Sequence, residues 1–594
     1  MRRQRSGTPG AHAAAGRGPA RPPRHAASRR SALPRERLWV ALLLVLHAGL
    51  AVWGVARNSV TFDENFHLPA GVLIVARGDY SASVAQPPLV KALCAVPVLA
   101  LGGRLPSAEA MASGDEGTVG ESFMRLNAAR YHALFLAARL VVVALSLLLA
   151  LLVWWWSRRL HGPRGALLSL ALYALAPEAL AHAGVVGMDL ATGLASTAVM
   201  AAFWMFCRSG RWRWWAWTAL ATGAAFLVRF SAVQLVPALL ALAVLGAALG
   251  RLRRPRRVWI GLLLLVPATW LALAAGYAGQ LWLGSISALP FRSETFRALA
   301  HAHPGWRLPV PVAWLSGLDY LSLIGQAGAA HTYLLGRIHE GRLWYYFPLA
   351  LVFKWPLGLL GALGLRAVAA LRHPPGPRRR WHAAFLLVPA AVMLGTAMAA
   401  GFDVGVRYLF PLVPLAAILC GGLMRLRCRA GRTPARAWRL AAVALAALLA
   451  LETALAAPWY LSFFNWPSGG PGGGDRLLND SNVDWGQGLI ALRDEMRRRG
   501  IGRIHLAYHG TTDPAIYGIE YVPYLGGTPG PESEWLAVSS YYFVGLSQRM
   551  MTPRGRTDFL RLDFSALWGR PWAARPAGCL YLFPLSPRAP EAGP

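Results

Sequence analysis

Long apolar segments that alternate with short arginine clusters constrain this 594-residue chain more than any other feature. A run of about 17–25 apolar residues is long enough to cross the hydrocarbon core of a bilayer as a helix. Eleven runs fit this pattern, and we predict a membrane-spanning helix in each. They are residues 38–56, 131–156, 165–181, 189–207, 212–229, 231–250, 258–284, 343–371, 382–400, 407–425 and 438–457.

The arginines indicate how the chain is threaded through the membrane. Residues 1–37 hold ten arginines and one glutamate, and five clusters without acids follow at alternate boundaries between the apolar runs. The clusters are residues 158–164, 208–213, 251–257, 372–380 and 425–439. Because basic residues concentrate on the cytoplasmic side, we predict a cytoplasmic N-terminus and an extracytoplasmic C-terminus. The tail and the clusters hold +30 of the net charge of +33, so topology explains the basicity and no nucleic-acid partner is predicted.

Three regions follow from this threading. We predict a disordered basic cytoplasmic tail at 1–37, a transmembrane domain at 38–457 with outer loops 57–130 and 285–342, and an extracytoplasmic domain at 458–594. The tail is too poor in apolar residues to form a core.

The extracytoplasmic region has a pattern of its own. Residues 489–499 have helical spacing, and residues 503–508 and 535–539 have the pattern of strands. We therefore predict a small α/β domain. The expected fold class is a mainly α, polytopic membrane protein of about eleven transmembrane helices with this domain attached. Residues 89–101 are apolar but short, and we expect them to lie at the interface.

Acidic residues gather where the helices meet the outer side. Asp63 and Glu64 follow the first helix, and His67 shares a helical face with Asp63 at four residues' spacing. Ionisable groups beside membrane cavities are functional by default, so Asp63 is a candidate general base; the alternative is a solvated loop in which Glu64 caps a helix. Asp189 begins a later helix, where helix capping explains it equally well.

Three cations lie in the outer half of the predicted bundle. Lys91 would sit at headgroup depth, either pairing with a phosphate or merely snorkelling. Arg139 lies about 12 Å inside its helix at 1.5 Å per residue. It therefore needs a partner, either a lipid or an acid such as Glu178 or Glu452. Arg407 could bind a lipid phosphate or pair with Asp403.

Several short motifs follow one another in a fixed order. They are Thr61-Phe-Asp-Glu64, Gly78-Asp-Tyr80, Pro87-Pro-Leu89, Met188-Asp189, Gly223 to Ser231, Trp344 to Pro348, Lys354-Trp-Pro356 and Gly405 to Pro411. Their order resembles that of the polytopic C-type glycosyltransferases of family 39, which include protein O-mannosyltransferases and the lipid A aminoarabinose transferase. The motif Asp480-Ser-Asn-Val-Asp-Trp-Gly-Gln487 resembles that of a bacterial branch.

The resemblance implies a C-type fold and an enzyme. Such enzymes transfer a sugar from a polyprenyl-phosphate donor to a protein, lipid or glycan acceptor, here on the outer face of a bacterial plasma (inner) membrane. Membrane lipids are further partners. The resemblance implies catalytic roles for Asp63, Glu64 and Asp189, and phosphate binding by Lys91, Arg139 and Arg407. Further candidates are His67, Asp480 and Asp484.

No metal site or cofactor is predicted with certainty. Asp63, His67 and Asp189 could together hold a divalent metal, but members of the resembled family need none as a rule. The cysteines show no spacing typical of zinc or of a disulfide framework. They are Cys94, Cys207, Cys420, Cys428 and Cys579. The alternative function is a polytopic transporter or flippase, which would show repeated halves with broken helices; we find no such symmetry.

Overall fold

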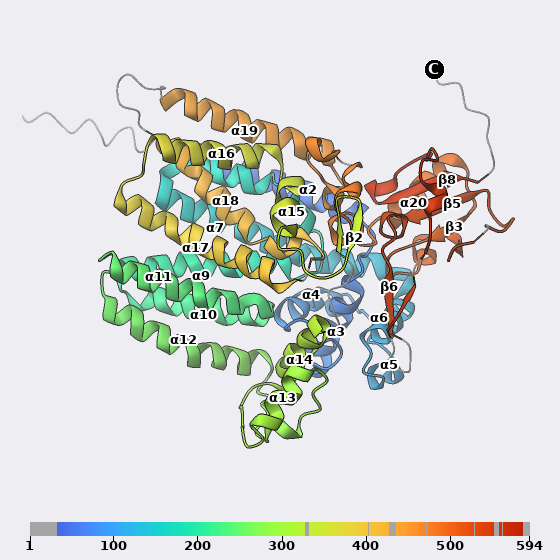
Figure 1. Ribbon diagram of the computed structural model, residues 1–594, viewed down its shortest axis with the longest axis horizontal. Coiled ribbons are helices and arrows are strands. Elements are labelled where there is room, and N and C mark those ends of the chain that lie inside the picture. Colours follow the sequence, from blue (N-terminus) through green and yellow to red (C-terminus); the bar gives the residue numbers. More distant parts are fainter. Residues whose placement is uncertain are drawn as a thin grey trace, which may run out of the picture.

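A computed structural model describes most of the chain. The described residues are 32–326, 332–401, 403–426, 435–470, 472–527, 529–551, 557–560 and 562–585. Most of the basic tail, Cys428 and part of the last arginine cluster lie outside them. A bundle of long helices is joined at one end to a smaller α/β domain (Figure 1).

The predicted apolar runs all form helices of the bundle. These are α2 (Ala32–Arg57), α7 (Tyr131–Ala174), α9 (Asp189–Ser209), α10 (Trp212–Val228), α11 (Leu235–Ala248), α12 (Pro255–Gly276), α15 (Tyr346–Lys354), α16 (Leu357–Arg372), α17 (Pro377–Ala400), α18 (Leu412–Cys420) and α19 (Ala435–Ala456). The short helix α8 (Pro177–Ala183) follows α7. The mainly helical polytopic fold is thus confirmed.

Helix length and composition alone support fewer full-length spans than the eleven predicted. Among the described residues, seven helices are long and apolar enough to cross a membrane, or eight if α15 and α16, which meet at 112°, are one span. Residues 212–228 and 412–425 form helices shorter than a typical bilayer crossing. The second of these runs contains Gly421 and Gly422, where the α-helix changes to a 3₁₀ turn.

Helix α7 contains two of the predicted runs and doubles back between them. Gly162 has φ 79° and ψ −177°, so the helix is interrupted there. The Oγ atoms of Ser157 and Ser169 are 2.8 Å apart, and the hydroxyls of Ser146 and Tyr173 are 3.0 Å apart. Twelve residues of continuous helix would separate Ser157 from Ser169 by about 18 Å. The chain therefore reverses at Gly162, as the arginine cluster at 158–164 predicts, although the second arm is short.

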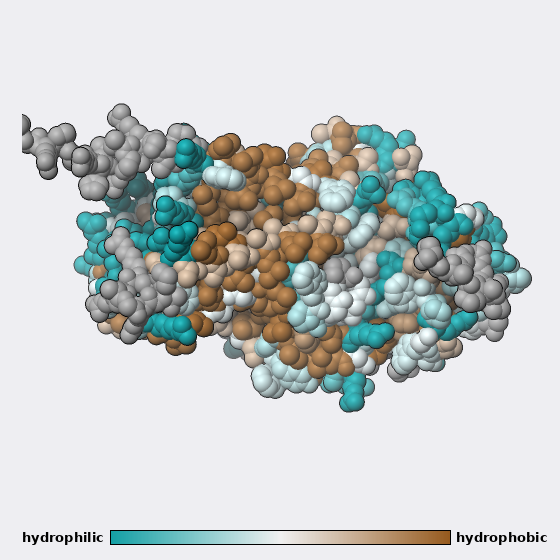
Figure 2. Space-filling model, turned by 90° about the horizontal axis from the view of Figure 1, so that it is seen from above, coloured by the Kyte–Doolittle hydropathy of each residue, from teal (hydrophilic) through white to brown (hydrophobic). Residues whose placement is uncertain are grey.

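The surface of the bundle matches a lipid environment. On the face seen in Figure 2, apolar side chains form a broad band over the helices, with hydrophilic residues at both ends. Large apolar side chains point outward from α2, α12 and α19, among them Val45, Leu263 and Leu451. Exposed apolar patches of this extent mark a membrane-facing surface.

Four arginine clusters meet at one end of the bundle, which we call the arginine end. The amide of Arg253 donates to the carbonyl of Cys207 at 3.1 Å, and Arg257 donates to the carbonyl of Gly210. Arg425 donates to the carbonyl of Leu160. These contacts link clusters that are far apart in the sequence, which agrees with the predicted alternation of the helices.

The opposite end carries the segments predicted as outer loops. The first contains α3 (Glu64–Arg77), α4 (Leu89–Ala100), α5 (Ala108–Ala112) and α6 (Glu116–Leu126). The second contains α13 (Glu294–Ala302), α14 (Val312–Gln326) and the hairpin of β1 (Thr332–Leu334) and β2 (Arg337–His339). Helix α4 has only 12 residues, and its length agrees with an interfacial position.

The C-terminal region forms the predicted α/β domain. Its elements are α20 (Leu489–Arg499), α21 (Ser540–Phe543), β3 (Arg503–Ala507), β4 (Glu520–Pro523), β5 (Trp535–Ser539), β6 (Gln548–Met551), β7 (Thr557–Leu560) and β8 (Leu580–Pro584). The central sheet has the order β4-β3-β5-β8, in which β8 alone runs antiparallel to its neighbour, and β6 pairs with β7. Every residue of β5 is buried, which agrees with its uninterrupted apolar sequence.

Candidate active site

A pair of opposite charges lies where the bundle meets the α/β domain. The Nη1 atom of Arg407 is 2.8 Å from Oδ2 of Asp63, and the two side chains keep exposures of 14% and 28%. Asp63 directly precedes α3, and Arg407 lies in a short 3₁₀ turn, Val406–Leu409, before α18. The predicted alternative partner, Asp403, instead accepts a hydrogen bond from the amide of Leu343. Two predicted candidates, 344 residues apart, therefore form one partly accessible unit.

The pair keeps Asp63 ionised. Burial alone would raise the pKa of Asp63, but the charges of Arg407 and His67 and the hydrogen bond from Arg407 lower it below its usual value. The Nε atom of Arg407 is buried and has no hydrogen-bond partner among the described residues. The guanidinium has five N–H donors, so it keeps donors for a further acceptor beyond its bond to Asp63.

A second acid–cation pair lies beside the first. Arg229, which follows α10, donates through Nη1 to Oδ1 of Asp189, the first residue of α9. The aromatic ring of Tyr408 links the two pairs, because its centroid is 4.4 Å from the guanidinium carbon of Arg229 and 5.5 Å from that of Arg407. Asp189 also lies 3.9 Å from Nδ1 of His182. This places Asp189 near Asp63, as predicted, but in an ion pair rather than in a simple helix cap.

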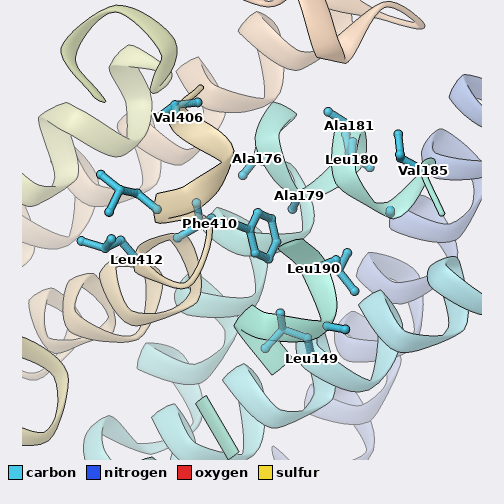
Figure 3. Packing of buried hydrophobic residues seen from close by; sticks show 14 of the residues in the cluster. Leu149, Ala176, Ala179, Leu180, Ala181, Val185, Leu190, Val406, Phe410 and Leu412 are labelled. Carbon is cyan, nitrogen blue, oxygen red and sulfur yellow. The ribbon is translucent and has the colours of Figure 1, made fainter. Parts of the chain in front are cut away.

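A closely packed apolar core surrounds Phe410, which follows the turn that carries Arg407. The ring of Phe410 lies among Ala179 of α8, Leu190 of α9 and Leu149 of α7 (Figure 3). A Cβ atom placed on Gly193 would come within 2.6 Å of the Phe410 ring, so only glycine permits this approach. The turn that carries Arg407 is therefore held against α9 by packing.

Glu64 and Arg139 form a fully buried pair away from this opening. Both side chains are completely buried, and Nη2 of Arg139 is 2.6 Å from Oε2 of Glu64. Glu64 also accepts from the amides of Thr61 and Val186. Arg139 further donates to three main-chain carbonyls, those of Val55, Asn58 and Ser59. The expectation that Arg139 pairs with Glu178 or Glu452 is therefore wrong.

These contacts leave neither group of the buried pair free. The donors of Arg139 are satisfied within the protein, so the structure does not present it to a lipid phosphate. Glu64 fastens the segment before α3 to α7 and to the turn at Val186. We interpret the pair as a support for Asp63 rather than as part of the reacting site.

Lys91 and His67 are also engaged with main-chain groups. Nζ of Lys91 is buried and donates to the carbonyls of Ser83 and Gln86, each at 2.7 Å. Nδ1 of His67 is 3.1 Å from the carbonyl oxygen of Val186. The amide of His67 bonds to the carbonyl of Asp63, which confirms their helical spacing. Both side chains therefore stabilise the conformation of the outer segment 57–130.

The motif at residues 480–487 forms a loop next to the Asp63–Arg407 pair. The ring of Trp485 covers Arg407, with its centroid 4.0 Å from the guanidinium carbon. Asp480 has the positive φ of 61° and is partly buried, and burial raises its pKa to about 6. Asp484 is buried deeper, accepts from Ser539 and from the amide of Gly486, and burial raises its pKa to about 7. Asp480 therefore borders the site, whereas Asp484 lies behind it.

Asp63, His67 and Asp189, the residues considered as metal ligands, have other partners in the structure. Asp63 and Asp189 each bind an arginine, and His67 faces a carbonyl oxygen. Within the described ranges, no group of three His, Cys, Asp or Glu side chains is placed to hold a metal ion. Asp63, Asp189 and the two arginines instead form the two ion pairs of the site.

Two residues of the site were not among the predicted candidates. Arg229 lies within the motif Gly223 to Ser231, and its lone charge beside an apolar helix is the signal that could have revealed it. Trp485 belongs to a motif that the sequence singles out, but only the structure shows its ring on Arg407.

Together these features define a multi-pass membrane protein with a charged site at the junction of its helices and its α/β domain. Residues 117–272 match the family model of the dolichyl-phosphate-mannose-protein mannosyltransferases. The match indicates a glycosyltransferase that uses a sugar carried on a lipid phosphate, which agrees with the predicted resemblance at that level. The matched segment includes Arg139, Asp189 and Arg229.

Solved structures give further similarities. ArnT from Cupriavidus metallidurans bound to undecaprenyl phosphate shares 14% identity over 92% of this chain and 97% of that chain, with a TM-score of 0.44. The archaeal oligosaccharyltransferase AglB from Archaeoglobus fulgidus, in complex with an inhibitory peptide and a dolichol-phosphate, shares 13% identity over 90% of this chain and 75% of that chain, with a TM-score of 0.42. No curated protein matches the chain in sequence.

Proposed function

We propose that this protein transfers a sugar from a polyprenyl-phosphate donor to an acceptor hydroxyl, with Asp63 as the general base. The observation that carries the proposal is the partly exposed pair of Asp63 and Arg407. A transfer of this kind needs a carboxylate to take the acceptor proton and a fixed cation to receive the leaving phosphate. Here the two groups are 2.8 Å apart.

The proposed reaction balances in one step. The acceptor oxygen attacks the anomeric carbon of the sugar and loses its proton to Asp63. The bond between that carbon and the phosphate oxygen breaks, and the polyprenyl phosphate leaves with the electron pair. Arg407 binds the phosphate through guanidinium donors that Asp63 does not occupy. Arg229 and Asp189 hold Tyr408 and the neighbouring wall of the site in place.

We place the site on the extracytoplasmic face of a bacterial plasma membrane. The arginine end lies opposite to the site, and basic residues favour the cytoplasmic side. On this orientation the α/β domain and both outer loops lie outside the cytoplasm. A lipid-linked donor can then present its phosphate at the level of Arg407.

The proposal is tested with purified full-length protein in liposomes. Polyprenyl phosphate carrying a radiolabelled sugar is added with a total membrane extract as the source of acceptors. We expect loss of labelled donor with the wild-type protein and at least a hundredfold slower loss with Asp63→Asn. Glu121→Gln, which changes an exposed acid of α6, is the matched control. Equal donor consumption by wild type and Asp63→Asn would contradict the proposal.

A further inference from the structure

The 480–487 loop touches both segments that carry the proposed catalytic pair. On one side, the amide of Phe62 donates to the carbonyl of Trp485 at 2.8 Å, directly before Asp63. Ser59 adds bonds to the carbonyls of Gly486 and Gln487. These bonds fix the position of the main chain directly before Asp63.

On its other side, the same loop holds the segment of Arg407. Oδ1 of Asn482 accepts from the amide of Val406 at 2.9 Å, and Oγ of Ser481 donates to the carbonyl of Val404 at 2.8 Å. A Cβ atom on Gly405 would come within 2.4 Å of the Ser481 hydroxyl, so the two segments are closely apposed. The Trp485 ring then covers the guanidinium itself.

Residues of α15 in turn hold the 480–487 loop in place. Nδ2 of Asn482 donates to the hydroxyl of Tyr346 in α15, and Nζ of Lys354 donates to the carbonyl of Asn482. Within the loop, the side chain of Gln487 accepts from the amide of Trp485 and donates to the carbonyl of Val483. A loop with this many satisfied buried groups has one arrangement.

We propose that the 480–487 loop positions the catalytic pair, with Trp485 as the residue that orients Arg407 toward Asp63. This inference rests on the proposed function. In this proposal Trp485 acts by restricting the guanidinium of Arg407 through a cation–π contact. The α/β domain thereby takes part in the active site through its connecting loop.

Trp485→Leu tests the proposal because it leaves the main chain of the loop intact. We expect kcat to fall about tenfold in the protein that remains folded, the size of a partly desolvated cation–π contact. The acid limb of the pH–rate profile should also move to higher pH, since a displaced Arg407 no longer lowers the pKa of Asp63. Trp485→Phe retains an aromatic face and should restore most of the rate. Trp466→Leu, at an exposed tryptophan of the same region, is the control.

The outcomes separate the two proposals. A normal rate and pH profile in folded Trp485→Leu, with Asp63→Asn inactive, would overturn the positioning role alone. An equal loss in Trp466→Leu would do the same. An active Asp63→Asn would overturn the proposed function itself.

A separate feature lies near the arginine end of the bundle. A groove of about 370 Å³ runs between α7, α9 and α10 and is lined only by apolar residues, including Trp154, Trp155, Trp214 and Trp217. The rings of Trp155 and Trp214 lie 6.0 Å apart across it. We call it the tryptophan groove. Its lining residues on α9 begin at Ala198, whereas Asp189 of the candidate active site is the first residue of that helix.

Positive charge borders this groove. The guanidinium carbon of Arg159 lies 3.8 Å from the Trp155 ring centroid, and that of Arg213 lies 5.5 Å from the Trp214 ring centroid. Neither arginine forms a salt bridge with a described residue. In addition, Nε1 of Trp214 is buried without a hydrogen-bond partner in the described part of the chain, whereas Nε1 of Trp154 bonds to Glu36.

We infer that the tryptophan groove binds an anionic glycerophospholipid. One acyl chain occupies the groove, and the phosphate faces the exposed side chains of Arg159 and Arg213. The apolar lining and the two cations complement the two parts of such a lipid. This inference does not depend on the proposed function.

Native mass spectrometry of the full-length protein in detergent tests the lipid site. After incubation with phosphatidylglycerol or phosphatidylcholine at equal concentration, the wild type should retain phosphatidylglycerol preferentially. Arg159→Gln/Arg213→Gln should lower that retention about thirtyfold, at about 1 kcal/mol for each cation. Arg378→Gln/Arg379→Gln removes the same charge from exposed positions of α17 and should have little effect. Equal retention of both lipids, or an equal loss in both double variants, would overturn the inference.

Discussion

Nη1 of Arg407 lies 2.8 Å from Oδ2 of Asp63, although the two residues are 344 positions apart. The contact brings a candidate base and a candidate phosphate-binding cation into one opening between the helices and the α/β domain. It also makes the chemistry of each residue depend on the other. This dependence leads to the first prediction.

Arg407→Gln should change how the reaction rate depends on pH. In the wild type, Arg407 lowers the pKa of Asp63, so Asp63 stays ionised and the rate falls only below the usual carboxylate range. Without Arg407, burial raises that pKa, and the rate should fall at a higher pH. The measurement is single-turnover rate from about pH 4 to pH 8. Arg130→Gln, an exposed arginine near α7, should keep the wild-type profile; an unshifted profile in Arg407→Gln would refute the coupling.

Glu64→Gln should lower stability more than it lowers turnover. The change leaves Arg139 buried without its counter-charge, which costs about 3–5 kcal/mol when one partner of a buried ion pair is removed. Thermal unfolding in detergent should show a large decrease in Tm. The fraction that remains folded should still consume donor far faster than Asp63→Asn. A stable but inactive Glu64→Gln protein would instead assign Glu64 to the reaction.

Asp484 should make the stability of the C-terminal region depend on pH. Its pKa is raised to about 7 in the folded chain, against about 3.9 when unfolded. Between these values the folded state binds a proton that the unfolded state releases, so stability falls as pH rises from about 4 to 7. Asp484→Asn stays neutral and should flatten this dependence in unfolding measurements. Asp494→Asn, at a partly exposed acid of α20, should not flatten it.

Cysteines placed at the two ends of the bundle should react with a thiol reagent from opposite sides of the membrane. Arg256 is exposed at the arginine end, and Glu532 is exposed in the α/β domain. Cysteines placed at these positions, in a Cys428→Ser background, are treated with an impermeant thiol reagent on intact cells. We expect reaction at position 532 and protection at position 256 until the membrane is opened. The reverse result would invert the proposed orientation.

The sequence predicts the elements of this fold better than it predicts their contacts. Apolar runs and arginine clusters locate the helices and even the reversal at Gly162, because both patterns follow from the local chemistry of a bilayer. Helix lengths were harder to predict, although Pro356 marks the break between α15 and α16, which meet at 112°.

The same distinction applies to the site. Asp63, Asp189 and Arg407 could be selected because lone charges beside apolar helices are costly. The sequence could not show that Arg139 binds Glu64 or that Trp485 covers Arg407, since both contacts join segments that are distant in the chain. Only the fold distinguishes a charge that supports the site from one that faces its opening.

The most direct test of the account is the turnover of Asp63→Asn. The substitution keeps the shape of the side chain and removes the carboxylate that would accept the proton. With purified protein of wild-type Tm, and with polyprenyl phosphate carrying a radiolabelled sugar, we expect turnover to fall by at least a hundredfold. Binding of the donor should change little, because the phosphate is held by Arg407. Turnover close to that of the wild type in the folded variant would contradict the assignment of Asp63 as the base.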